Sequence, residues 1–182
     1  MEVLPYRSEM LSDVVALYNR ATAPVPHCYG VSDATFERGF MNLSEGRQKE
    51  HRLGKQEVLV AREKGGVIGF IHLAFKDGQT DEGVIRFFAY ERGKREAGQM
   101  LLDAGRAWLR EHGATRIHVF PQELIYPFYH IECAYLSDRM DHVQALLGMN
   151  GYRRVRGEVF LDWAGFEKRD PLPTDVNVTI GI

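Results

Sequence analysis

Cysteine is scarce in this sequence of 182 residues. The two cysteines, Cys28 and Cys133, lie far apart and form no Cys-x-x-Cys pair. A disulfide-stapled scaffold needs more cysteines and a zinc ribbon needs them in close pairs, so both classes are disfavoured. Two free thiols suit a reducing compartment.

Long apolar runs are also missing. No stretch approaches the roughly 20 apolar residues that span a membrane. The first residues, MEVLPY, lack the basic region and apolar run of a signal peptide. The formal net charge of −2 gives no overall field to gather nucleic acid or an anionic membrane. We therefore expect a cytoplasmic protein that binds neither.

Several catalytic signatures are absent. The sequence has no Gly-x-Gly-x-x-Gly loop of a dinucleotide-binding fold, no His-Glu-x-x-His metal motif and no Gly-x-Ser-x-Gly nucleophile elbow. Its seven histidines show no paired spacing. We therefore expect neither a metal site nor a hydrolase triad.

The composition is that of an ordinary globular domain, with 45% hydrophobic and 26% charged residues. We assign 1–170 to a single domain. Pro171 and Pro173 mark a linker, and residues 174–182 alternate apolar and polar side chains like a half-buried strand. Because an unpaired strand is a liability, this segment is predicted to join a sheet edge in its own chain or a partner's. We expect a homodimer.

Hydrophobic spacing sets the order of the elements. Three strands in succession predict an antiparallel meander, whereas the strand-helix-strand unit from Gly83 to Phe120 needs a crossover and hence parallel strands. The predicted fold class is α/β, with a mixed, mostly antiparallel sheet and one parallel strand-helix-strand unit. Strands are expected at 3–6, 57–62, 67–75, 83–89, 116–120 and 155–163, with a hairpin turn at Gly65-Gly66. One helix is expected to begin at Ser12 and a second, short helix to follow a cap at Ser32-Asp33. Two further helices are expected at 96–112, ending at Gly113, and at 141–147.

The segment 87–102, FFAYERGKREAGQMLL, gives the clearest indication of a binding site. A strand ends there, a basic turn follows and a long helix begins. A helix N-terminus presents unpaired amides and a partial positive charge, which favour phosphate. Arg92, Lys94 and Arg95 add charge for a pyrophosphate or a 3′-phosphate. The same residues are equally consistent with a solvated basic turn.

Most of the chain, from about Val3 to Trp163, resembles the GCN5-related N-acetyltransferases (GNAT). The resemblance is carried by the element order, the hairpin EVLVAREKGGVIGFIHLAF, the helix and strand AGQMLLDAGRAWLREHGATRIHVF, and the ending ALLGMNGYRRV, where Gly151-Tyr152 resembles the family's Gly-Phe turn. It implies the acyl-CoA N-acyltransferase fold, acetyl-CoA as acyl donor, and a primary amine of a small molecule or peptide as acceptor. Two alternatives stay open: a module of the same fold that binds acyl-CoA as a regulatory ligand or has lost it, and a phosphate-handling enzyme unrelated to CoA.

The resemblance also implies a set of donor-binding residues. In the family, the strand before the basic turn splays from its neighbour, and pantetheine pairs with the main chain that Phe87, Phe88 and Ala89 provide here. These two rings are also consistent with plain core aromatics. Gly98 matches the last glycine of the family's loop, while Glu96 and Gly93 stand where the first glycine and the basic residue belong. The full donor-binding set is Phe87, Phe88, Ala89, Arg92, Lys94, Arg95, Ala97, Gly98 and Gln99.

Amine attack on a thioester needs a base for the ammonium proton and a donor for the departing thiolate. Many family members supply the donor as a tyrosine four residues before the Gly-Phe turn, where this chain has Leu147. We expect Tyr129 as the donor and Glu123 as the base. An alternative stays open for both residues: Tyr129 packs in the core and Glu123 is solvated. The stretch 126–130 either lines an acceptor pocket or caps the core. The reserve candidates are Tyr126 and Tyr135 as donors and Glu132 and His130 as bases.

Overall fold

The computed structural model describes residues 1–40, 53–129, 135–159 and 165. A five-stranded sheet in the order β1-β2-β3-β4-β5 forms its centre. Neighbouring strands are antiparallel except β4 and β5, which are parallel, so the predicted mixed sheet is confirmed. The edge strand β1 pairs with a distant stretch, with Glu2 opposite Arg62. The strands are β1 (Glu2–Pro5), β2 (Leu53–Glu63), β3 (Gly66–Lys76), β4 (Glu82–Tyr90) and β5 (Arg116–Val119).

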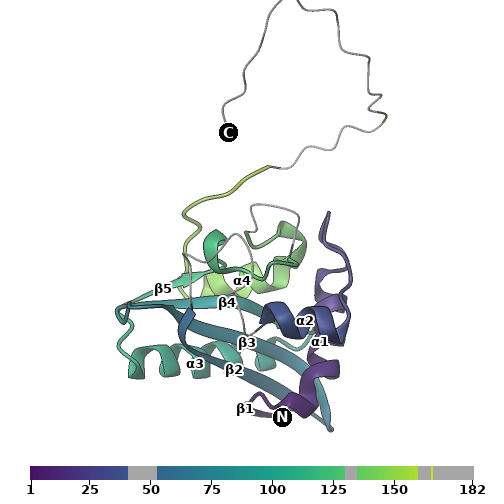
Figure 1. The fold of residues 1–182 in the computed structure, drawn as a ribbon, viewed down its shortest axis with the longest axis horizontal. Helices are drawn as coiled ribbons and strands as arrows, with labels where there is room; N and C mark the ends of the chain where they lie inside the picture. Colours follow the sequence, from purple (N-terminus) through teal and green to yellow (C-terminus); the bar gives the residue numbers. More distant parts are fainter. Residues whose placement is uncertain (41–52, 130–134, 160–164, 166–182) are drawn as a thin grey trace, which may run out of the picture.

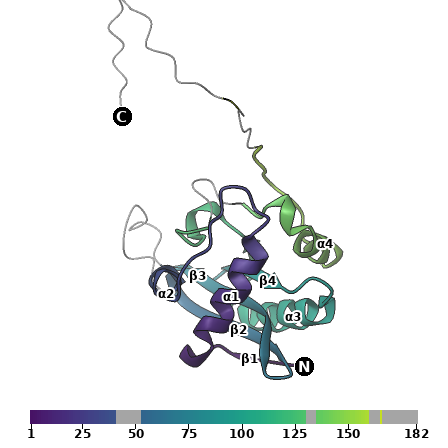
Figure 2. The same ribbon diagram turned by 90° about the vertical axis from the view of Figure 1, so that its right-hand side faces the viewer.

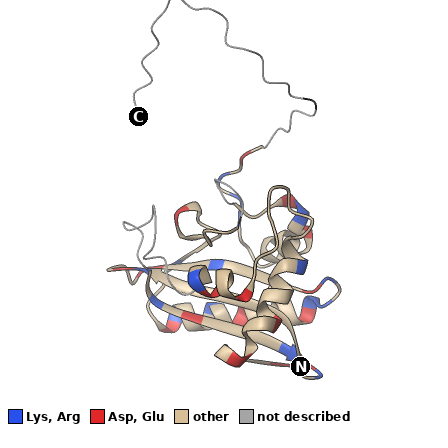
Figure 3. Ribbon diagram, turned by 45° about the vertical axis from the view of Figure 1, so that its right-hand side comes forward, with Lys and Arg blue, Asp and Glu red and all other residues tan. Residues whose placement is uncertain are grey.

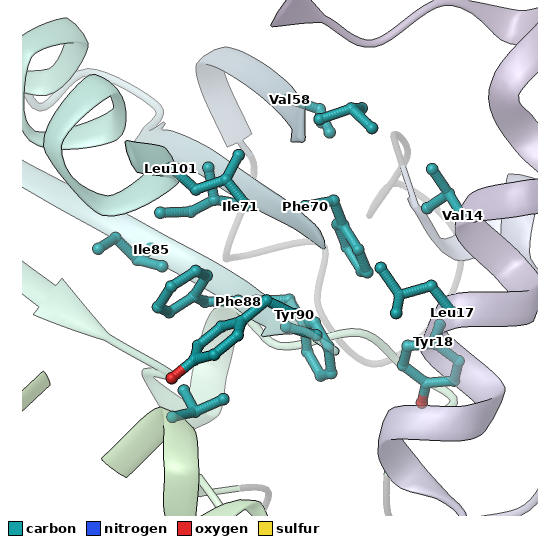
Figure 4. Close-up of a cluster of buried hydrophobic side chains, with 14 of the residues drawn as sticks. Val14, Leu17, Tyr18, Val58, Phe70, Ile71, Ile85, Phe88, Tyr90 and Leu101 are labelled. Atoms are coloured by element: carbon teal, nitrogen blue, oxygen red, sulfur yellow. The ribbon is translucent and has the colours of Figure 1, made fainter. Parts of the chain in front are cut away.

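Helices cover both faces of this sheet (Figures 1 and 2). Helices α1 and α2 lie on the face that carries Phe70, and α3 lies on the opposite face beside Ile71 (Figure 4). Consecutive strand residues point to opposite faces, so β3 contributes to both layers of the core. Helix α4 packs against α3 and β4. The helices are α1 (Leu11–Thr22), α2 (Asp33–Phe40), α3 (Arg95–Glu111) and α4 (Asp141–Met149).

Local turn chemistry fixes several boundaries. The β2–β3 hairpin turns at Lys64 and Gly65, whose φ values of 51° and 88° are both positive, as a type I′ turn requires. The turn therefore lies one residue earlier than the predicted Gly65-Gly66. Gly113 ends α3 with φ of 102°, which confirms the predicted left-handed stop. Ser32 Oγ accepts from the amide three residues on at 3.2 Å, so the predicted cap of α2 is also confirmed.

An extra residue interrupts the pairing of β3 with β4. His72 lies opposite Phe87 and Leu73 lies opposite Ile85, so Arg86 has no partner in β3. Such a β-bulge bends its strand and increases the local twist. The bulge therefore redirects the second half of β4 relative to the strands on either side.

The side chain of Arg86 ties this bulge to two other elements. It is fully buried, with Nε donating to the carbonyl of Leu124 at 2.6 Å and Nη1 donating to that of Phe40 at 2.7 Å. Burial lowers the pKa of the Arg86 guanidinium to about 10, so the group remains charged at neutral pH. Phe40 is the last residue of α2, and the negative end of a helix dipole favours a cation there.

The region after α4 differs from its prediction. Residues 155–159 form no strand, and Val155 and Val159 are 95% and 85% exposed. This stretch leads away from the sheet (Figure 1). A strand needs a hydrogen-bonding partner, and within the described part of the chain no strand lies beside it. The remainder of the predicted strand 155–163, Cys133, and the tail 174–182 that motivates the homodimer lie outside the described residues.

Replacing Arg86 by Met is expected to lower the free energy of unfolding by about 2–4 kcal/mol, because two buried carbonyls lose a charged donor. Arg86→Lys keeps the charge and one donor and should lose less. Urea unfolding of the three proteins measures the difference. An Arg86→Met protein as stable as the wild type would contradict the role assigned to these two hydrogen bonds.

Candidate functional site

Strand β5 accompanies only the first part of β4. Their pairing ends where Ile85 lies opposite Val119, and the amide of Phe120 donates to the Ile85 carbonyl at 2.9 Å. Beyond this point β5 has ended, while β4 continues to Tyr90, and we call the region beside this second half of β4 the fork. Buried rings fill its base: Phe87 lies 5.2 Å from Phe120 and 5.3 Å from Tyr129, centroid to centroid. The family resemblance implies a splay at this point, and that splay stays a prediction; the structure shows that the pairing of β5 with β4 ends before β4 does.

Among the described residues, no strand pairs with the outer edge of β4 beyond Ile85, and we call this the open edge of β4. The amide that follows the strand, Glu91 N, donates to a carbonyl of β3 at 2.8 Å. Backbone groups of an antiparallel strand alternate between its two neighbours, so Ala89 and Phe87 also direct theirs to β3. Phe88 and Tyr90 direct their N–H and C=O groups to the open edge. Of the three predicted main-chain residues, only Phe88 faces the fork, and Tyr90 joins it.

The turn from β4 into α3 leaves backbone amides that could bind an anion. The amide of Lys94 donates to the Glu91 carbonyl at 2.9 Å, and Gly93 between them has φ of 83°. The first intrahelical bond of α3 runs from the amide of Gly98 to the Lys94 carbonyl at 3.2 Å, and no side chain caps the helix. The amides of 95–97 therefore lack intrahelical acceptors and carry the positive end of the helix dipole.

Two of the three predicted phosphate-binding cations already have partners. Lys94 pairs with Glu63, which lowers the pKa of the Glu63 carboxyl and raises that of the ammonium. Arg92 binds the carboxylate of Asp141 at 2.7 Å, and this hydrogen bond lowers the pKa of Asp141. Figure 3 shows acidic and basic residues interspersed over the helices and strands. Arg95 is exposed and forms no ion pair with the described residues.

A cavity of about 200 Å³ lies at the end of β4, between α1, the β4–α3 turn and the first turn of α4. Three arginines line it, against a single carboxylate, that of Glu91, which pairs with Arg20 at 3.0 Å. The excess of positive charge favours a small anion. The principal lining residues are Leu17, Arg20, Tyr90, Arg92, Arg139 and His142.

Gly98, predicted to bind the donor, has a packing role that the sequence did not indicate. It is buried under the ring of Tyr90, and a Cβ at this position would lie 2.6 Å from that ring and 2.9 Å from α4. The glycine is thus required for the packing of β4 and α4 on α3. A bulky residue at this position would therefore disturb the packing as well as any ligand. Its predicted neighbours also face the protein: Ala97 is buried, and Gln99 exchanges hydrogen bonds of 3.0 Å with Asn150.

The two predicted catalytic residues lie in different environments. Tyr129 is buried at the base of the fork, where its hydroxyl donates to the Tyr135 carbonyl at 3.2 Å and accepts from the Ser137 amide at 3.3 Å. Burial raises the pKa of this phenol. Glu123 is exposed on the short 3₁₀ turn after β5 and forms no hydrogen bond or ion pair with described residues. No contact joins the two side chains.

The other candidate donors and bases either form hydrogen bonds with other residues or lie outside the described residues. Tyr126 bonds to Nδ1 of the buried His72 at 2.9 Å. Tyr135 donates from its hydroxyl to Gln122 at 3.1 Å. His130 and Glu132 lie outside the described residues. The 126–129 stretch packs against α1 and α2, which corresponds to the core-capping alternative.

Two residues of this site were missed from the sequence. Tyr90 had a local signal, because counting back by two from the end of β4 identifies the residues that face the open edge. His142 had none, because it meets Tyr90 across 52 residues. Its place depends on how α4 docks onto β4.

Among the described residues, no group of three or more His, Cys, Asp or Glu side chains is arranged to hold a metal ion. In the same part of the chain, no helix combines the length and apolarity needed to cross a membrane.

Gly98→Ala should lower the free energy of unfolding by about 1–3 kcal/mol, because the new methyl group overpacks the contact with Tyr90. Gly148→Ala is the matched control, since nothing lies within 4 Å of a Cβ at this helical position. It should stabilise the protein by about 0.5–1 kcal/mol through helix propensity. Thermal unfolding of both variants checks this, and equal shifts in the same direction would contradict it.

No protein-family model matches the sequence, and no curated protein matches it. Solved structures do match its fold. The GCN5-related glucosamine N-acetyltransferase region of a fungal multi-domain GH3 β-N-acetylglucosaminidase has a TM-score of 0.61 at 20% identity, over 84% of this chain and 17% of that longer one. The chain thus spans about a sixth of that protein.

Two further structures cover most of both chains. An aminoglycoside 6′-N-acetyltransferase from Acinetobacter haemolyticus has a TM-score of 0.55 at 15% identity, over 93% of this chain and 100% of the other. AAC(6′)-Iy, in complex with the bisubstrate analogue CoA-S-monomethyl-acetylneamine, has a TM-score of 0.54 at 14% identity, over 88% and 96%. The strand order, the fork and these superpositions agree, and the chain has the fold of the GCN5-related N-acetyltransferases.

Proposed function

We propose that this protein is an N-acetyltransferase that moves the acetyl group of acetyl-CoA to a primary amine of a small molecule or peptide. The observation that carries the proposal is the open edge of β4, which leads to a cationic cavity and to the free amides of α3. An acyl donor with a peptide-like arm and a pyrophosphate fits this spatial order of binding groups.

The main chain of β4 suits the arm of the donor. Pantetheine contains two amides, and the open-edge groups of Phe88 and Tyr90 offer amide donors and acceptors of the kind that pair strands. The pyrophosphate would lie at the first turn of α3, within reach of Arg95 and of the arginines of the cavity. AAC(6′)-Iy, whose fold this chain shares, was solved with a CoA-containing analogue, and this supports the same class of donor.

The chemistry requires two proton transfers. The neutral amine nitrogen forms a bond to the thioester carbon and loses a proton, the carbon–sulfur bond breaks, and the thiolate takes up a proton. We assign the first transfer to Glu123, which is exposed at the end of β5 where the fork opens. We assign the second to Tyr129, which packs on Phe87 in the fork. Burial raises the pKa of this phenol, so it stays protonated at neutral pH and would stabilise the departing thiolate as a hydrogen-bond donor, not act as a base.

A second candidate is a module that binds acyl-CoA without catalysis. It is favoured by the internal partners of Lys94 and Arg92 and by the buried Leu147, which has no proton to donate. Both candidates bind the same donor and differ only in turnover. A cytoplasmic location and a homodimer formed through 174–182 remain predictions.

Donor binding is expected to raise the unfolding midpoint. At a hundredfold excess over Kd, CoA and acetyl-CoA should each stabilise the protein by about 2.7 kcal/mol. ATP lacks pantetheine and should stabilise it much less. Release of free thiol from acetyl-CoA over a panel of aminoglycosides, polyamines and peptides then tests catalysis. Stabilisation by CoA without turnover would favour the binding module, and a shift with ATP alone would contradict both candidates.

Two variants test the proton transfers, with an amine that the wild-type protein acetylates. Glu123→Gln should lower kcat by about 10²–10⁴-fold and remove the acidic limb of the pH–rate profile. Tyr129→Phe should lower kcat with little effect on the KM for the amine. Since Tyr129→Phe also removes a hydrogen bond to Tyr135, its unfolding midpoint must be measured beside its rate. Wild-type rates in both variants would reject these two assignments.

A further inference from the structure

The open edge of β4 carries a contact that the proposed function does not require. Tyr90 and His142 form two reciprocal hydrogen bonds: His142 Nε2 donates to the Tyr90 carbonyl at 3.0 Å, and the Tyr90 hydroxyl donates to the His142 carbonyl at 2.8 Å. Their rings meet edge to face, with centroids 4.9 Å apart. The imidazole thus occupies one of the backbone acceptors that the fork leaves open.

The hydrogen-bond partners fix the proton of this imidazole. A carbonyl only accepts, so Nε2 carries a hydrogen. Nδ1 is buried and has no hydrogen-bond partner, with Asp141 Oδ1 lying 3.5 Å away. The ring therefore presents an N–H to the strand edge as the amide of a neighbouring strand would.

A second contact joins the same turn of α4 to the basic loop. Arg92 donates to the carboxylate of Asp141 at 2.7 Å and to the carbonyl of Arg139 at 3.0 Å. The carboxylate is held in place because it also accepts from the amide of His142 at 2.6 Å. Two groups that a donor would use, the Tyr90 carbonyl and the Arg92 guanidinium, are therefore both bound to residues 139–142.

We propose that the first turn of α4 competes with the donor for its own site. His142 holds the place of a pantetheine amide at the Tyr90 carbonyl, and Asp141 holds the place of a phosphate at Arg92. Binding of CoA exchanges both internal contacts for contacts to the ligand and releases this turn of α4 from the β4–α3 loop. The inference rests on the proposed function, because it concerns the same donor.

Thermodynamic linkage gives this exchange a measurable signature. A variant that removes an internal contact destabilises the empty protein but not a complex in which that contact is already broken. Such a variant should bind the donor more tightly and, when empty, should unfold at a lower temperature. A residue that merely supports the site would lose affinity and stability together.

Calorimetry with two probes separates the two contacts. His142→Ala should bind both pantetheine and CoA about three- to tenfold more tightly than the wild type, the range expected for one hydrogen bond. Asp141→Asn removes the ion pair with Arg92 but keeps the bond of Arg92 to the Arg139 carbonyl, and it should tighten CoA by a similar factor while leaving pantetheine, which has no phosphate, unchanged. Asp141 is exposed, so this variant tests the proposal even if His142→Ala does not fold.

Gln144→Ala is the matched control. Gln144 donates to the Ser137 carbonyl at 2.9 Å, so its loss also weakens the start of α4 but touches neither Tyr90 nor Arg92. Its unfolding midpoint should fall with CoA affinity unchanged. Equal or weaker CoA binding by both His142→Ala and Asp141→Asn would overturn the inference and leave the proposed function standing. Absence of CoA binding by the wild type and every variant would overturn both.

Discussion

The bulge at Arg86 is the constraint on which the site depends. Without the bulge, β4 would keep its alternation, and a different set of backbone groups would face its outer edge. One additional residue shifts the alternation and bends the chain. The backbone groups of Phe88 and Tyr90 are thereby directed to the edge that β5 does not cover, while their side chains remain in the core. Arg86 stabilises the irregularity by binding α2 and the turn after β5.

The charges around the fork are arranged in pairs that a ligand can exchange. Arg20, Arg92 and Lys94 each contact a carboxylate from a different element, so the empty loop is held by its neighbours. Exposed pairs of this kind contribute little stability on their own. Their weakness makes them suitable for exchange, since a phosphate with two charges can displace a single carboxylate at small cost. If a phosphate displaces these carboxylates, the β4–α3 loop needs few unpaired cations to bind it.

The sequence was sufficient to predict most of the fold and only part of the site. Strand alternation, helix periodicity and turn residues are local, so the order of elements, the mixed sheet and the stop at Gly113 could all be derived. The environment of Gly98 could not, because the ring of Tyr90 reaches it through the packing of β4 on α3. The contact of His142 with Tyr90 likewise depends on the docking of α4. The role of Glu123 stays a prediction, because sequence spacing does not determine where a side chain points.

The pairing of β1 with β2 has a consequence for how the chain acquires its fold. The hairpin of β2 and β3 closes through a two-residue turn and costs little loop entropy. By contrast, Glu2 must find Arg62, and this strand is the first to be synthesised. During translation β1 leaves the ribosome before β2 and has no partner in this sheet until β2 has been made. The segment that separates β1 from β2 is much longer than the hairpin turn, so we expect this pairing to form after the β2–β3 hairpin.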